Sequence, residues 1–208
     1  MNRRFKYPTV PIPDSFDPFD VQVDEWFEAH LRQSRGVDLL MYGASAVGDH
    51  GIVWLGLAAI QARRRHQRGQ PWVRPFLRVS IGLGVESIVV NGPVKLMFRR
   101  TRPRHDGPRP MHLRQPRTSS FPSGHATAAF FGAALLRQDD PMWPLYYALA
   151  VIVAASRVHV RIHHASDVIG GVVTGIALGE LVRRLVPLES RAEQDSPEPT
   201  GPGPSRPE

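Results

Sequence analysis

Five apolar stretches limit what this chain can fold into. They lie at roughly 38–61, 76–97, 124–137, 143–160 and 167–186. Most approach the ~20 residues that a helix needs to cross the hydrocarbon layer of a bilayer, although 124–137 is too short by itself. We therefore expect an all-α fold, a multi-pass membrane helical bundle with about five transmembrane helices. A soluble helical bundle is the alternative, because ionisable residues such as Asp49, His50 and Glu86 interrupt the apolar stretches.

Small residues recur within these stretches. Gly171, Gly175 and Gly179 are spaced four apart, which places all three on one face of a helix. Such faces allow two helices to approach closely in lipid. We expect the last helix to pack tightly against a neighbour through this face.

The two ends of the chain differ from its centre. Residues 1–37 form an N-terminal segment in which 20–35 alternates apolar and charged positions, as an amphipathic helix at the membrane interface does. An ordinary packed surface helix would give the same pattern. Residues 187–208 are rich in Pro, Ser and Glu, which predicts a disordered tail. The domain itself is expected to span 38–186.

Arginine dominates the positive charge. The net charge is +7, and only two of the 26 basic residues are lysines, a bias that we interpret as a bacterial, GC-rich origin. We do not expect nucleic acid as a partner, because the arginines cluster at the ends of apolar stretches without interleaved aromatics. The chain has no cysteine, which excludes disulfides and thiolate metal sites.

The arginines of loop 61–78 predict the orientation in the membrane. Short cytoplasmic loops are enriched in basic residues, so this loop is expected inside the cell. Counting spans from there places loop 99–122 and the turn near residue 163 outside. We therefore expect a protein of the bacterial plasma membrane with these segments on the extracytoplasmic face.

Three polar clusters fall at this same face. They are Lys95-x6-Arg102-Pro103, Pro122-Ser123-Gly124-His125 and Ser156-Arg157-x5-His163-x3-Asp167. Each one alone is an ordinary membrane-flanking or helix-end sequence. Their convergence on one face indicates a single site.

The cations of the clusters suit a phosphoryl group. Lys95, Arg102 and Arg157 offer one point charge and two planar forks that can neutralise phosphoryl oxygens, without a metal or other cofactor. Ser123 and Gly124 precede an apolar helix, whose N-terminus favours anions. We predict these five residues to bind phosphate.

Two histidines can then divide the chemistry between a nucleophile and a general acid. Asp167 lies one helical turn after His163 and can orient its ring, which leaves the other ring nitrogen free to attack. His125 remains as the acid. We therefore predict His163, His125 and Asp167 as the catalytic residues.

Taken in order, the three clusters resemble the signature of the type 2 phosphatidic acid phosphatases, a superfamily that includes bacterial acid phosphatases and vanadium haloperoxidases. All signature positions are present. The resemblance, which covers roughly 40–185, implies a helical bundle, a phosphohistidine at His163, and His125 protonating the leaving group and later activating water. It also implies a lipid phosphate as substrate and membrane lipids as surroundings.

The resemblance leaves several functions open. Polyprenyl diphosphate, phosphatidate, phosphatidylglycerophosphate and polyprenyl-phosphate sugar phosphates are all possible substrates, and we favour a polyprenyl diphosphate. An idle membrane protein that binds or moves lipids, or a haloperoxidase using the same anion site, are the alternatives. The oligomeric state is not predicted.

The remaining charged residues are expected to be structural or solvated. We expect Asp49 and Glu86 to make structural polar contacts. The remaining loop arginines should be solvated: Arg99, Arg100, Arg104, Arg109, Arg114 and Arg117.

Overall fold

The apolar stretches form helices in the computed structural model, which describes residues 10–11, 16–48, 51–103, 118–138 and 140–188. The elements are β1 (Val10–Pro11), α1 (Asp17–His30), α2 (Arg35–Val47), α3 (Ile52–Gln67), α4 (Val73–Val89), the π-helical turn η3 (Val90–Val94), α5 (Lys95–Met97), β2 (Phe98–Arg99), α6 (Gly124–Leu136), α7 (Trp143–His159) and α8 (Ala165–Leu185). Apart from the short parallel pair β1–β2, every regular element of the described residues is a helix. The prediction of an all-α bundle is confirmed for this part.

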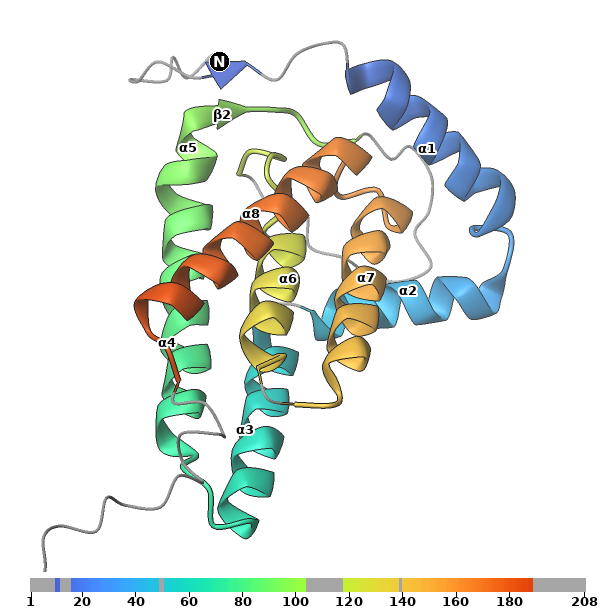
Figure 1. Cartoon of the computed structure of the whole chain (residues 1–208). Helices are drawn as coiled ribbons and strands as arrows, with labels where there is room; N and C mark the ends of the chain where they lie inside the picture. The colour runs from blue at the N-terminus through green and yellow to red at the C-terminus, as the bar shows by residue number, and fades with distance from the viewer. Residues whose placement is uncertain (1–9, 12–15, 49–50, 104–117, 139, 189–208) are drawn as a thin grey trace, which may run out of the picture.

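Helix α6 forms the centre of the bundle. Ten of its residues are buried, which is expected for a helix that is apolar on all sides. It packs against α8, α7, α4 and α3, and Figure 1 shows it enclosed by α4, α7 and α8. The short stretch 124–137 is therefore the core helix.

The glycine face of α8 lies against α6, as predicted. A Cβ on Gly171 would lie 2.6 Å from the Ser123 carbonyl oxygen, and one on Gly179 would lie 2.7 Å from the Ala134 Cβ. Side chains at these positions would force the two helices apart. This close approach matters because both helices begin at the site described below.

The first apolar stretch, 38–61, does not form one straight helix. It divides into α2 and α3, which meet at an angle of 75° across the break between Val47 and Ile52. Gly51 ends the break with a φ of +70°, a left-handed conformation that glycine adopts at little cost. Since both halves are apolar, the pattern gave no sign of this bend.

The second stretch, 76–97, is also interrupted. Helix α4 passes into η3, where Gly92 leaves helical geometry and Pro93 follows. Proline lacks an N–H and clashes with the preceding turn, so a regular helix cannot continue through it. The irregular turn carries the chain into α5 and brings Lys95 to the end of the bundle.

By length and composition, α8 is the one helix in the described residues that could cross a membrane as a single straight segment. The bent pair α2–α3 passes the same test when taken together. The count of five transmembrane helices therefore stays a prediction.

Helix α1 packs on the outside of the bundle, against α7 and α8. Arg32, just beyond its end, donates to the carbonyl oxygens of Val158 and His159 at the end of α7. Its outer surface exposes Val21 and Trp26. The predicted helix is thus present, whereas its place at a membrane interface stays a prediction. The predicted disordered tail lies almost wholly in 189–208, outside the described residues.

Candidate active site

The three polar clusters meet at one end of the bundle, opposite the turn between α3 and α4 (Figure 1). They surround a cavity of about 310 Å³. Six of the eight predicted site residues line it: Lys95, Arg102, Gly124, His125, Arg157 and His163. Ser123 and Asp167 are fully buried and do not line the cavity. The predicted convergence of the clusters is therefore present in the structure.

Three cations reach this cavity from three different segments. Lys95 lies on α5 and is buried, and Arg157 lies in the last turn of α7, where it donates to Ser45 Oγ of α2. Arg102 follows β2, and its Nη1 donates to the Ile162 carbonyl at 2.9 Å and its Nη2 to the Ser119 carbonyl at 3.2 Å. The wall of the cavity is therefore positively charged.

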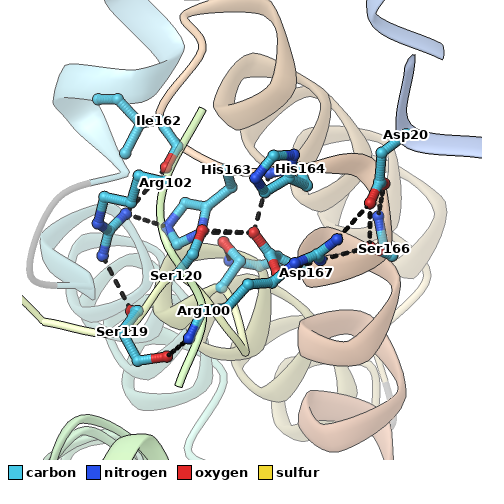
Figure 2. A network of polar contacts seen from close by, with 12 residues as sticks. Asp20, Arg100, Arg102, Ser119, Ser120, Ile162, His163, His164, Ser166 and Asp167 are labelled. Atoms are coloured by element: carbon cyan, nitrogen blue, oxygen red, sulfur yellow. Dashed lines mark hydrogen bonds and ion pairs between the residues drawn. The ribbon is translucent and has the colours of Figure 1, made fainter. Parts of the chain in front are cut away.

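His163 occupies the turn between α7 and α8, with a side chain only 3% exposed. Its Nε2 lies 3.1 Å from Arg102 Nη1. A guanidinium only donates, so Nε2 must accept and carries a lone pair. Nδ1 then carries the ring proton and faces Ser120 Oγ at 3.4 Å (Figure 2).

The electrostatic surroundings keep this ring neutral. Burial is the largest cause that lowers the pKa of His163, to about 3, and Arg102 and Arg157 act in the same direction, although Asp167 opposes them. The neutral form is the nucleophilic one, because Nε2 is then unprotonated and keeps its lone pair. His163 is therefore in its reactive form at neutral pH.

Asp167 supports this ring less directly than predicted. Its Oδ2 lies 3.7 Å from His163 Nδ1, which is an ion-pair distance rather than a hydrogen bond. Oδ2 instead accepts from Ser120 Oγ at 2.5 Å and from the His164 backbone N–H at 2.9 Å. Because Asp167 is in the first turn of α8, it also caps that helix. Ser120 thus lies between the carboxylate and the ring.

Ser123 and Gly124 fix the beginning of α6. Ser123 Oγ accepts from the Ala126 N–H, and the Ser123 N–H donates to the Asp167 carbonyl at 3.0 Å. A Cβ on Gly124 would lie 2.9 Å from Asn91 Oδ1, so this position has no room for a side chain. The helix N-terminus therefore opens onto the cavity beside η3.

His125 is in the first turn of α6 and lines the same cavity as His163. Gly48, at the end of α2, packs against its ring, since a Cβ there would lie 3.5 Å from His125 Cδ2. The bend between α2 and α3 thus closes one side of the site. The two histidines reach this cavity from different segments, His125 from α6 and His163 from the turn between α7 and α8, so a nucleophile and an acid can both act on one bound group.

Sequence reasoning missed three residues around the site. Arg100 was expected to be a solvated loop charge, and this is wrong: its side chain is 8% exposed and its Nη1 lies 2.7 Å from Asp167 Oδ1. Ser120 bridges Asp167 and His163, as described above. Glu86 lines the cavity, and its Oε1 is buried without a hydrogen-bond partner among the described residues. Only the position of Arg100, two residues before Arg102, hinted at its role.

The other residues considered from the sequence lie elsewhere. His159 Nε2 contacts Asp38 at 2.7 Å, and His164 Nε2 contacts the Thr101 carbonyl at 3.2 Å. Some of the predictions concern residues or side chains that the structure does not describe. These are Asp49, the side chain of Arg99 and the loop arginines Arg104, Arg109, Arg114 and Arg117. Within the described ranges, no three acidic or histidine side chains are grouped to hold a metal ion.

Comparison with known proteins identifies the family. The PAP2 superfamily model matches residues 75–191, which include all three clusters. The chain belongs to the PAP2 superfamily. The predicted resemblance is therefore confirmed.

Relatives of this PAP2 protein are phosphatases. It is 31% identical to decaprenylphosphoryl-5-phosphoribose phosphatase of Mycobacterium tuberculosis over 67% of this chain and 75% of the relative. It is 37% identical to an undecaprenyl-diphosphatase of Sulfolobus acidocaldarius over 44% of this chain and 46% of that protein.

A solved structure shares its fold. The crystal structure of a transmembrane PAP2-type phosphatidylglycerolphosphate phosphatase from Bacillus subtilis matches with a TM-score of 0.63 and 24% identity. The match covers 83% of this chain and 87% of that one. At this identity the likeness supports the helical arrangement alone.

Proposed function

We propose that this PAP2 protein is a metal-independent lipid phosphate phosphatase. It hydrolyses a phosphomonoester or a diphosphate through a phosphohistidine intermediate. The observation that carries the proposal is the cavity that Lys95, Arg102 and Arg157 line together with a neutral His163 and with His125.

The chemistry follows from this arrangement. The lone pair of His163 Nε2 attacks phosphorus, and the bond from phosphorus to the leaving oxygen breaks while His125 donates a proton to that oxygen. His125, now neutral, takes a proton from water, whose oxygen attacks the phosphohistidine and releases phosphate. Lys95, Arg102 and Arg157 stabilise the charge that develops on the phosphoryl oxygens in both steps.

The protein acts from within a membrane in this proposal. Helices α3, α4 and α8 expose large apolar side chains on their outer faces, which water would not favour over so much surface. Examples on these faces are Ile52, Leu77, Ile81, Ile88, Val173 and Leu181. With the turn between α3 and α4 in the cytoplasm, the cavity opens at the extracytoplasmic face of the bacterial plasma membrane.

The favoured substrate is a phosphate ester or diphosphate of a polyprenyl lipid. Two relatives are named for such lipids, decaprenylphosphoryl-5-phosphoribose and undecaprenyl diphosphate. Phosphatidate is the second choice. Both classes offer the same anion to the cavity and differ in the rest of the headgroup.

Phosphate release by the purified protein in detergent tests the function. A panel of polyprenyl diphosphate, polyprenyl-phosphate sugar phosphate, phosphatidate and phosphatidylglycerophosphate is assayed with and without EDTA. We expect release with EDTA present and inhibition by vanadate, which mimics the phosphoryl group in the cavity. Strict dependence on Mg²⁺ would contradict the proposal.

Two further outcomes separate the alternatives. Binding of these lipids without any phosphate release would indicate an idle lipid-binding protein. Halide oxidation by the vanadate-loaded protein, without phosphate release, would indicate a haloperoxidase.

A further inference from the structure

Arg100 is one of the six spacer residues of the first cluster, between Lys95 and Arg102, and lies at the centre of a buried polar network (Figure 2). Its Nη1 donates to Asp167 Oδ1 at 2.7 Å and to Ser166 Oγ at 2.6 Å. Its Nη2 donates to Asp20 Oδ2 at 2.5 Å. One guanidinium thus bridges two carboxylates from distant parts of the chain.

Asp20 belongs to α1 and contacts the start of α8 as well. Its Oδ1 accepts from the Ser166 backbone N–H at 2.8 Å, and its Oδ2 accepts from Ser166 Oγ at 2.7 Å. Its side chain is only 4% exposed. A carboxylate so deeply buried is retained where a cation and hydrogen bonds compensate for lost hydration, and Arg100 with Ser166 provides both.

The network determines how Asp167 faces the histidine. Oδ1 of Asp167 is taken by Arg100, and Oδ2 by Ser120 Oγ and the His164 N–H. With both oxygens engaged, the carboxylate cannot rotate to pair with another cation of the site, such as Arg102. Its Oδ2 therefore stays beside Ser120 and His163 Nδ1.

We infer that Arg100 is a positioning residue for the phosphatase reaction. Asp20 of α1 is its second partner and holds the Arg100 guanidinium in place against Asp167. Helix α1 is then part of the active-site architecture rather than only a surface or interfacial element. The inference rests on the proposed function, because it assigns Arg100 and Asp20 a role in orienting the predicted nucleophile through Asp167.

The chain provides a matched control on the same helix. Asp24, four residues after Asp20, pairs with Arg32 at 2.6 Å and with Arg161 at 3.1 Å. These contacts also attach α1 to the bundle, but none of them reaches Asp167. Asp20→Asn and Asp24→Asn therefore both weaken the docking of α1, while only the first removes a contact of Arg100.

The test measures kcat, KM and the thermal unfolding midpoint for wild type, Asp20→Asn, Asp24→Asn, Arg100→Ala and Arg100→Lys. We expect Arg100→Ala to lower kcat by about 10²-fold with little change in KM, since misplacing a catalytic group by about 1 Å has an effect of this size. Asp20→Asn should lower kcat by a smaller factor, and Asp24→Asn should keep wild-type kcat even where its midpoint falls. Arg100→Lys keeps the charge but lacks the two separate terminal nitrogens that contact Asp167 and Asp20, so it should fall between wild type and alanine.

Two readouts separate positioning from stability. The loss in Arg100→Ala should be equal for alkyl and aryl phosphates, because it acts on the nucleophile rather than on the leaving group. Added guanidinium ion should restore part of its kcat. Equal losses of kcat in Asp20→Asn and Asp24→Asn, or wild-type kcat in Arg100→Ala, would overturn the inference while leaving the proposed function intact. Absence of phosphate release by the wild type would instead refute the proposed function.

Discussion

His163 and His125 face the same cavity but have different surroundings, and this difference predicts different kinetic defects. His163→Ala should abolish turnover and any labelled phosphoenzyme for every substrate. His125→Ala should lose about 10²–10⁴-fold on a lipid alkyl phosphate, yet far less on an aryl phosphate, whose leaving group needs no proton. Rapid-quench labelling measures both. Phosphate found on His125, or a labelled intermediate in His163→Ala, would reverse the roles.

The planar guanidinium of Arg102 contacts Nε2 of His163, the nitrogen proposed to attack phosphorus. One terminal nitrogen contacts both His163 and the Ile162 carbonyl, while the other contacts the Ser119 carbonyl. An ammonium cannot make this set of contacts, so Arg102→Lys should lower kcat/KM by roughly 10²-fold. Arg183→Lys, at the far end of α8 where Arg183 pairs with Glu180, is the control and should retain activity. Near-normal turnover in Arg102→Lys would remove Arg102 from the site.

The lowered pKa of His163 predicts a pH dependence of stability. The unfolded chain binds a proton at this histidine as the pH falls through about 6.5, whereas the folded protein does not until about 3. Protonation therefore favours the unfolded state, and stability present above pH 6.5 is lost progressively as the pH falls towards 3. The unfolding midpoint of His163→Gln in detergent should fall less between pH 7 and 5 than that of wild type. Parallel curves would contradict the assigned pKa.

The contact between α6 and α8 predicts the effect of one added methyl group. A Cβ on Gly175 would clash with the Thr127 backbone carbonyl oxygen and lie 3.0 Å from the Phe131 backbone nitrogen. Gly175→Ala should therefore cost about 1–3 kcal/mol of stability and reduce turnover, because both helices begin at the site. Gly84→Ala in α4 is the control, since its Cβ would meet nothing within 4 Å. It should be neutral or stabilise by about 0.4–1 kcal/mol. Equal unfolding midpoints for the two variants would contradict this.

Comparison of the helices with the apolar stretches shows which parts of the fold hydropathy predicts. Stretches 143–160 and 167–186 predicted α7 and α8 closely, because each is one straight apolar run. Hydropathy did not reveal the bend between α2 and α3, since a change of direction leaves composition unchanged. Six of the site residues met as predicted because their clusters flank helices that end at the same side. Arg100 was missed because its partner Asp20 lies 80 residues away, and spacing within a motif carries no information on such a contact.

The whole molecule has one predicted orientation, and the absence of native cysteine makes it easy to measure. Gln67→Cys lies at the end of α3 in the predicted cytoplasmic loop, and Gln115→Cys lies in the predicted outer loop. In intact cells an impermeant maleimide should label only the second variant, and after permeabilisation it should label both. Labelling of Gln67→Cys in intact cells would invert the orientation and place the cavity in the cytoplasm.

The size of the cavity determines how much of a lipid substrate can enter the site. About 310 Å³ accommodates a small phosphorylated headgroup and leaves no space for a long isoprenoid chain. The isoprenoid chain of the substrate would remain among the surrounding lipids during turnover. Enzyme and substrate would therefore meet by lateral diffusion in two dimensions. The relevant concentration is then the mole fraction of substrate in the bilayer or micelle. Adding inert detergent at constant bulk substrate should therefore slow the reaction by surface dilution.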